Sequence, residues 1–140
     1  VAAQMIGALK IQHEYINKDG LTYNVTKIGA NAFASCSNLT GDLILPDTIT
    51  NIGSNAFDGC SGFDGILKLS KNTASIPWCG FRGCGKLIGD LVIPEGVVSI
   101  DNQAFLGCAS LSGNLFLPET LITLTGAAFQ NCSYLYQVSA

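Results

Sequence analysis

The sequence is poor in charged residues, and this scarcity excludes whole classes of protein. Charged residues make up 12% of the 140 residues and apolar residues 48%, whereas soluble domains carry about 25% charged residues. Intrinsic disorder is excluded, because disordered chains are rich in charge and poor in apolar side chains. A net charge of −3 argues against a nucleic-acid partner, which requires a basic surface. We therefore expect one folded domain that does not bind nucleic acid.

Long apolar runs and histidine are scarce as well. No stretch approaches the ~18–20 apolar residues that cross a bilayer, so no membrane insertion is predicted. His13 is the only histidine, and a Ser-His-Asp triad would depend on it alone. The sequence thus predicts no catalytic residues, no metal site and no cofactor.

What the sequence does contain is a repeat of 24 residues. Five of the six cysteines follow it: Cys36, Cys60, Cys84, Cys108 and Cys132. Five phenylalanines keep the same interval: Phe33, Phe57, Phe81, Phe105 and Phe129. Four leucines keep it too: Leu43, Leu67, Leu91 and Leu115. Fixed spacing of this length is typical of solenoids, in which equivalent side chains of stacked units form ladders.

Each unit is predicted to contain two short extended segments and a turn. Residues 42–45 (DLIL) alternate between polar and apolar sides, which indicates a strand, and Pro46 ends it. Residues 48–52 (TITNI) form a second short extended piece or arc. The AFxxC segments are too short for a stable α-helix and are expected to form tight turns. Equivalent strands run in the same direction, so the sheets are parallel, with coils ~4.8 Å apart.

These residues also carry a family resemblance. The pattern L-x-(I/L)-P-x-x-(I/V)-x-x-I-G-x-x-A-F-x-x-C-x-x-L resembles the BspA-like leucine-rich repeats, from about Thr26 to Leu135. An extra glycine-bearing step (TGDL, SGNL) makes these units slightly longer than the commonest form, and the last unit drops it. The fold class that follows is a β-rich leucine-rich-repeat solenoid of about five coils. We expect it to be right-handed, from the crossover rule and from the resemblance.

The two ends of the chain depart from the repeat. Residues 1–25 fit the period poorly, and the Asp-Gly pair in NKDG favours a tight turn. We therefore expect an N-terminal β-hairpin cap over 1–25, followed by the solenoid over 26–140. The C-terminal coil offers Tyr134, Tyr136 and Val138 as exposed candidates for end-to-end self-association.

The stretch WCGFRGCG at 78–85 invites comparison with a redox-active thiol site. Cys84, however, belongs to the cysteine ladder, and only Cys79 is extra. Four residues separate these two thiols rather than the two of a Cys-X-X-Cys site. Stacked ladder cysteines would point the same way at ~4.8 Å, which suits neither a disulfide nor zinc. Five buried, reduced thiols are expected.

Two groups of surface residues are candidates for binding. The first is a stripe of outward strand positions, one per coil: Ile44, Lys68, Val92 and Phe116. It is flanked by Asp42, Ile66, Asp90 and Asn114, where Ile66 interrupts the polar residues. The second lies in the irregular third coil, where the basic residues Lys68, Lys71, Arg82 and Lys86 accompany the only tryptophan, Trp78. Trp and Arg are enriched at binding hot spots, although scattered exposed apolar residues and drift within a repeat are ordinary alternatives.

Three hypotheses about function follow. The resemblance implies a non-enzymatic protein-binding module of a bacterial cell-surface or secreted adhesion protein, with a host or matrix protein as its partner. A structural spacer that displays another domain is the alternative. An enzyme is the third, and no catalytic set of residues supports it.

Overall fold

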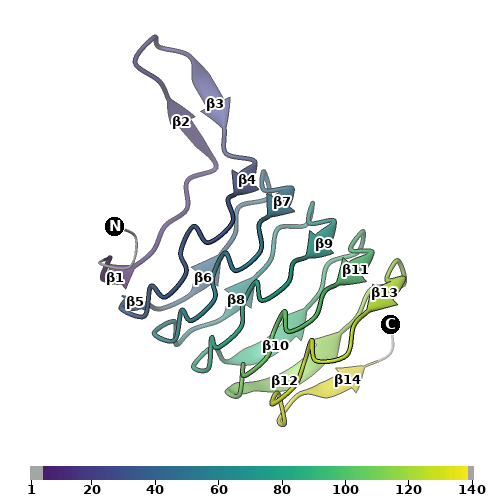
Figure 1. Ribbon diagram of the computed structural model, residues 1–140. Helices are drawn as coiled ribbons and strands as arrows, with labels where there is room; N and C mark the ends of the chain where they lie inside the picture. The colour runs from purple at the N-terminus through teal and green to yellow at the C-terminus, as the bar shows by residue number, and fades with distance from the viewer. Residues whose placement is uncertain (1–4, 139–140) are drawn as a thin grey trace.

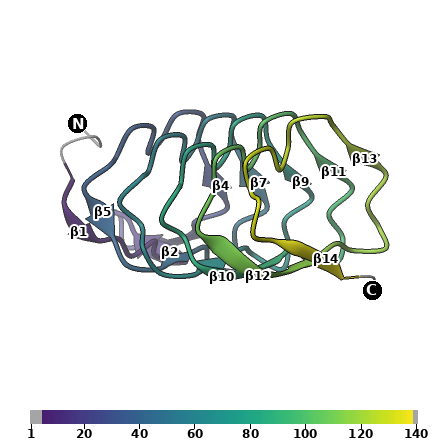
Figure 2. The same ribbon diagram turned by 90° about the horizontal axis from the view of Figure 1, so that it is seen from below.

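The computed structural model describes residues 5–138 and shows a stack of about five coils without a helix (Figure 1). Successive coils lie side by side along one axis, and β10, β12 and β14 run along one side of the stack (Figure 2). The predicted solenoid with parallel strands is therefore confirmed.

Most strands fall into two rows, one for each extended segment of the repeat. The first row contains β6 (Leu43–Ile44), β8 (Leu67–Lys68), β10 (Gly89–Val92), β12 (Leu111–Phe116) and β14 (Tyr136–Val138). The second row contains β4 (Lys27–Ile28), β7 (Asn51–Ile52), β9 (Ser75–Ile76), β11 (Ser99–Ile100) and β13 (Thr123–Leu124). All ladders within the rows are parallel, and Leu43 lies opposite Leu67 as the 24-residue period requires. In the last coil Asn114 lies opposite Tyr136, because the shorter final unit omits two residues.

The AFxxC segments form turns that link neighbouring coils, as predicted. The main-chain N–H groups of Phe33, Phe57, Phe81 and Phe105 each donate a hydrogen bond of 2.8 Å to a carbonyl of the next coil. Just before each turn, the backbone adopts a left-handed conformation with φ near 60° at Asn31, Asn55 and Gln103, and 53° at Cys79. Asn tolerates this conformation better than most residues, which accounts for its recurrence.

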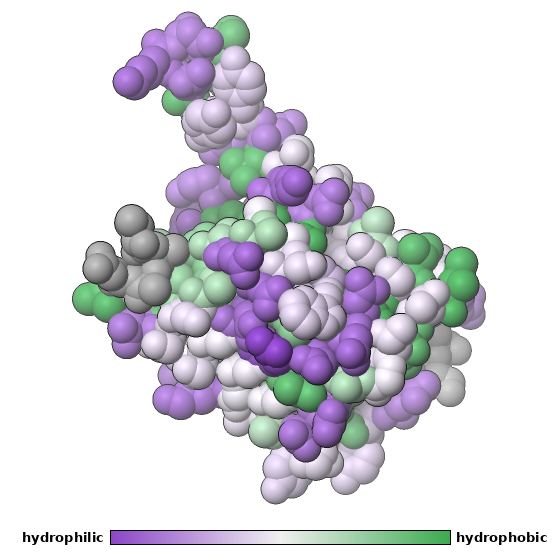
Figure 3. Space-filling model, viewed as in Figure 1, coloured by the Kyte–Doolittle hydropathy of each residue, from purple (hydrophilic) through white to green (hydrophobic). Residues whose placement is uncertain are grey.

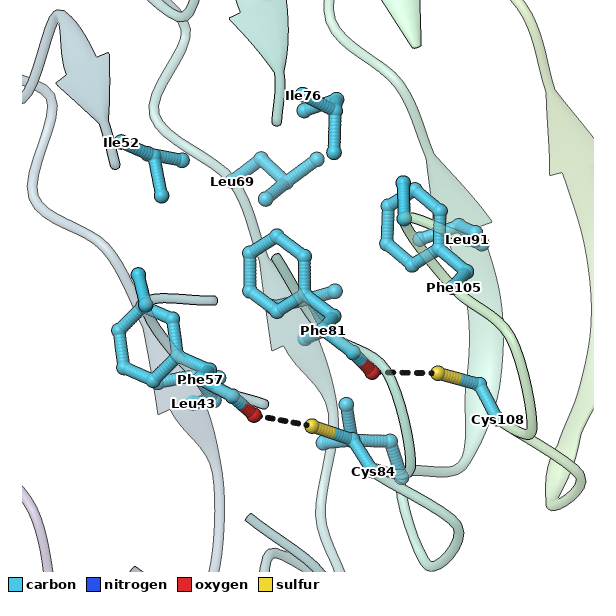
Figure 4. Packing of buried hydrophobic residues seen from close by; sticks show 14 of the residues in the cluster. Leu43, Ile52, Phe57, Leu69, Ile76, Phe81, Cys84, Leu91, Phe105 and Cys108 are labelled. Atoms are coloured by element: carbon cyan, nitrogen blue, oxygen red, sulfur yellow. Dashed lines mark hydrogen bonds between the residues drawn. The ribbon is translucent and has the colours of Figure 1, made fainter. Parts of the chain in front are cut away.

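Side chains of like kind stack through the core (Figure 4). The five repeat phenylalanine rings form a continuous column, with centroids 5.2–5.5 Å apart and planes within 6° of parallel. Leu43, Leu67 and Leu91 pack beside this column and are buried. Each coil therefore contributes one ring and its aliphatic neighbours to a core that only the next coil completes.

At the N-terminus, a hairpin forms where it was predicted. β2 (Glu14–Ile16) and β3 (Thr22–Asn24) pair antiparallel around a turn at 17–20. Within that turn the Gly20 N–H donates to the Asn17 carbonyl at 2.9 Å. All six strand residues are exposed, and the hairpin projects away from the coils (Figure 1).

The first coil is covered by other N-terminal residues. β1 (Gly7–Ala8) pairs in parallel with β5 (Leu39–Thr40), and Leu9 and Ile11 pack against the core. These residues cover the first coil, and the capping role of the hairpin stays a prediction. Residues 1–4 of the predicted 1–25 segment and 139–140 of the predicted solenoid lie outside the described residues, and the boundary at 25/26 stays a prediction.

Candidate functional site

The predicted stripe lies on one face of the first row of strands. Ile44 lies opposite Lys68 in the ladder of β6 and β8, and Val92 lies opposite Phe116 in that of β10 and β12. Ile44 is 41% exposed and Val92 54%, whereas Phe116 is only partly exposed. The stripe is thus a real feature of the fold, divided between two ladders.

The first row is split between β8 and β10. β8 pairs only with β6, and β10 pairs only with β12, so the described strands form two sheets there instead of one. A groove of about 640 Å³ lies at the split, within the size range of ligand pockets. Its walls come from both sides and from the following turns: Asp47, Ile66, Leu67, Lys68, Leu69, Lys71, Asp90, Val92 and Pro94. The groove therefore contains two residues of the predicted stripe, Lys68 and Val92.

The third coil departs from the repeat, but its buried polar side chains form hydrogen bonds. Ser70, which replaces the repeat proline, donates from its hydroxyl to the Ile49 carbonyl at 2.6 Å. Thr73 donates to the Ser70 carbonyl at 2.7 Å, and both side chains are buried. Pro77 has no N–H to donate at the position where Gly53 and Asp101 bond to the preceding coil. Accordingly, β9 pairs with β11 but not with β7.

The structure divides the second candidate group, because Lys68 and Lys71 line the groove whereas Trp78, Arg82 and Lys86 lie apart from it. Trp78 follows β9 in the turn and is 45% exposed, and the Arg82 guanidinium lies 5.9 Å from its ring centroid. Lys86 is exposed in the next turn. None of these three residues lines the groove, so the structure gives two separate candidate surfaces rather than one.

Arg82 is already engaged within the molecule. It binds the Asp58 carboxylate of the preceding coil through two hydrogen bonds, Nε to Oδ1 at 3.0 Å and Nη2 to Oδ2 at 2.7 Å. Its Nη1 also donates to Gln103 of the following coil at 3.0 Å. Although partial burial alone would raise the pKa of Asp58, the hydrogen bonds from Arg82 and Asn55 lower it on balance. Arg82 is therefore a link across three coils.

The thiols are buried, and burial raises the pKa of most of them, although the hydrogen bond with Cys108 lowers the pKa of Cys132. All six cysteines are free and buried, and burial raises the pKa of Cys60 to about 12. Burial also raises the pKa of Cys79, the extra cysteine of WCGFRGCG. A low-pKa thiolate, the mark of a redox site, is the opposite of what burial produces at these two positions.

No other chemistry-bearing cluster emerges in the described part of the chain. Residues 5–138 contain no group of three or more His, Cys, Asp or Glu residues that could hold a metal ion. They also contain no helix long and apolar enough to cross a membrane. His13 lies 3.9 Å from Glu14, and both side chains are exposed.

The split and its groove were missed in the sequence. From the sequence, Ile66 is predicted only to flank the stripe and to interrupt its polar residues, and no binding role is predicted for Asp47 or Pro94. The missed signal is the joint occurrence of Ile66, Ser70 and Pro77 in one repeat, three departures in the segments that pair with neighbouring coils. At the C-terminus Tyr134 and Tyr136 are exposed, at 64% and 73%, while the Val138 side chain lies outside the described part.

Comparisons with known proteins agree on the fold and family. Six copies of the BspA type leucine rich repeat region match residues 26–139. A leucine rich cell surface protein from Faecalibacterium prausnitzii is 30% identical with a TM-score of 0.76, over 94% of this chain and 31% of that one. The T. pallidum leucine rich repeat protein TpLRR is 29% identical with a TM-score of 0.74, over 93% of this chain and 56% of that one.

A leucine-rich repeat protein from Bacteroides ovatus, 24% identical with a TM-score of 0.60, shares the fold over 95% of this chain and 45% of that one. A search of curated proteins finds no match. The chain spans about a third to just over half of the length of these solved structures.

Leucine-rich repeat folds generally serve as non-enzymatic scaffolds for protein interaction. With its 24-residue coils and the match over 26–139, this chain belongs to the BspA-type leucine-rich repeat family.

Proposed function

We propose that this chain is a non-enzymatic protein-binding module of a bacterial cell-surface or secreted protein, and that it contributes to adhesion. The single observation that carries the proposal is the outward face of the first strand row. There, the exposed apolar residues Ile66 and Val92 line a groove of about 640 Å³, and Ile44 is exposed on the same face beside a second hollow.

The chemistry of that face suits recognition of a protein. Apolar side chains line the groove together with Lys68, Lys71 and Asp90, and protein interfaces combine apolar and charged residues in this way. Figure 3, drawn in the view of Figure 1, shows hydrophilic and apolar residues interspersed on that side of the molecule, without one large apolar patch. Of the solved relatives, the protein from F. prausnitzii is described as a cell surface protein, which supports a surface location here.

The direct test is binding of the immobilised protein to a panel of purified extracellular-matrix and serum proteins. We expect at least one partner, with binding weakened about tenfold or more by Val92→Asp. Trp78→Ala is the matched control on the separate surface and should bind normally. Loss of binding only in Trp78→Ala would move the site to the third-coil turn.

A structural spacer is the second candidate, and a specific observation favours it. Hydrogen bonds link the turns of every neighbouring pair of coils from Phe33 to Ala128, which makes a stiff rod suited to holding other segments apart. Failure to bind any member of the panel, in a protein that is folded by circular dichroism, would favour the spacer.

A further inference from the structure

The edges of β8 and β10 face each other across the split, and their backbone directions can be assigned. Along a strand, successive residues direct their N–H and C=O groups to opposite sides. Leu43 N–H donates to Ile66 O and Leu45 N–H to Lys68 O, both at 2.9 Å, so residues 66 and 68 face β6. Leu67 and Leu69 therefore face β10.

The same reasoning applies on the other side of the split. Ile93 N–H donates to the Phe116 carbonyl at 3.0 Å, so Ile93 faces β12. Val92, its neighbour, therefore directs its N–H and C=O toward β8. Ile88 N–H donates to Gly65 O at 2.9 Å across the start of the split, but no ladder joins β8 and β10 among the described strands. Beyond that bond, the groove has strand edges with unused pairing capacity on both walls.

A substitution in the repeat explains why the ladder opens here. In the preceding pair of coils, Asp42 Oδ1 accepts the Ile66 N–H at 2.8 Å. In the following pair, Asp90 Oδ1 accepts the Asn114 N–H at 2.7 Å. A β-carbon at Gly65 or Gly113 would collide with these carboxylates, so the glycines make room for them. Ile66, at the equivalent position, offers no oxygen to the N–H of Asp90.

The groove has side chains that define what could fill it. Ile66 and Val92 are 46% and 54% exposed and give it an apolar wall on each side. The Asp47 and Asp90 carboxylates already accept main-chain N–H groups. Lys68 and Lys71 form no ion pair within 4.0 Å in the described part of the chain; the two pairs there are His13–Glu14 and Arg82–Asp58. Positive charge is thus available to a ligand.

We infer that the groove binds an extended peptide segment of a partner protein, which adds as a strand along β8. The peptide backbone would pair with the N–H and C=O groups that Leu67, Leu69 and Val92 direct into the split. An apolar peptide side chain would contact Ile66 and Val92, and an acidic one would lie at Lys68 and Lys71. Main-chain pairing gives such complexes affinity, and alternate side chains give them specificity. This inference rests on the proposed function and specifies its partner.

A capped synthetic peptide that copies residues 89–95 (GDLVIPE) is a suitable probe. It reproduces the strand whose edge faces β8 and ends in an acidic residue. Added to ¹⁵N-labelled protein, it should slow hydrogen exchange at the Leu67, Leu69 and Val92 amides by about tenfold or more. The Leu43 and Leu45 amides, already bonded to β8, should not change. Protection of the first three amides in the free protein, or no binding at ~1 mM peptide, would overturn the inference.

The same peptide with N-methyl groups on its alternate amides is the backbone control, because it keeps the side chains and loses the donors. Binding as tight as that of the parent peptide would exclude strand pairing. This comparison uses the wild-type protein and so holds whether or not any variant folds.

Ile66→Asp tests the origin of the split. It should supply the missing carboxylate for the Asp90 N–H, close the groove and weaken peptide binding about tenfold. Ile44→Asp makes the same change on the same face, beside a different hollow lined by Leu9, Ile11 and Pro46, and should bind normally. Unchanged binding by a folded Ile66→Asp protein would overturn the inference. If panel proteins bind but the peptide does not, the proposed function survives and the strand-addition site is excluded. If the peptide binds but no panel protein does, the strand-addition site survives and the proposed function loses its support.

Discussion

The Cys84 thiol donates a hydrogen bond of 3.2 Å to the main-chain carbonyl of Phe57, one coil earlier (Figure 4). Cys60, Cys108 and Cys132 make the equivalent bond to Phe33, Phe81 and Phe105, at 3.0–3.2 Å. Each of these thiols thus links its own coil to the main chain of the stacked phenylalanine in the preceding coil. The cysteine repeat is better explained by this donor than by hydrophobic volume alone, which any small apolar residue could supply.

Cys84→Ala should lower the free energy of unfolding by about 2 kcal/mol, because it removes both a buried sulfur and its hydrogen bond. Cys36→Ala is the matched control. Cys36 likewise has no exposed surface, but it lies in the first coil and its partly buried thiol reaches only the Ala34 carbonyl, at 3.9 Å, so about half that loss is expected. Urea unfolding measures both, and equal losses would show that the thiol bond contributes nothing.

Phe57→Ala should cost about 3–5 kcal/mol by opening a cavity in the ring column. Phe57 is fully buried with a stacked ring on each side. Phe129, at the end of the column, stacks on one side only and is partly exposed. Phe129→Ala should therefore lose clearly less stability in the same urea titration. A loss under ~1 kcal/mol for Phe57→Ala would mean that the rings are not core.

Stability should fall as the pH rises above about 9. Burial raises the pKa of Cys60 from 9.0 to about 12 and raises that of Cys84 as well. Between these values the unfolded chain releases the thiol protons and the folded chain keeps them, so the unfolded state is favoured by about 1.4 kcal/mol per pH unit for each such thiol. Chemical denaturation at pH 7 to 11 measures the slope.

Cys84→Ala should have a shallower slope by the contribution of one thiol, while lysines and tyrosines, which also titrate in this range, remain the same. Parallel pH profiles for the variant and the wild type would contradict the assignment of the slope to buried thiols.

Arg82→Met should destabilise the protein by about 1 kcal/mol or less at pH 7, since Arg82 is partly exposed and solvent screens its pair with Asp58. The lowered pKa of Asp58 means that this contribution is present above the unfolded pKa, near 3.8, and is lost as the pH falls through the folded value. NMR titration should find the Asp58 pKa raised in Arg82→Met and unaltered in Lys86→Met. An unshifted Asp58 in both variants would exclude the pair as the cause.

The sequence was sufficient for the architecture because a solenoid repeats one local solution. Cys60, Phe57 and Leu67 recur at a fixed interval, so each has only one kind of neighbour in the stack, its own equivalent in the next coil. Stacking in register and burial of these residues follow from periodicity without long-range information. The alternation of residues 42–45 likewise predicted that the Ile44 side chain faces outward.

The tertiary structure decided the contacts between neighbouring coils whose residues differ at equivalent positions. Whether Ile66 opens the ladder depends on the main-chain N–H of Asp90 opposite it, and whether Arg82 is free depends on Asp58 and Gln103 in two other coils. Hydrogen bonds between non-equivalent residues of different coils cannot be predicted from the repeat period. The amino-acid sequence therefore determined the stacking of the coils. Only the tertiary structure showed where the strand ladder is open and which charged side chains already form ion pairs.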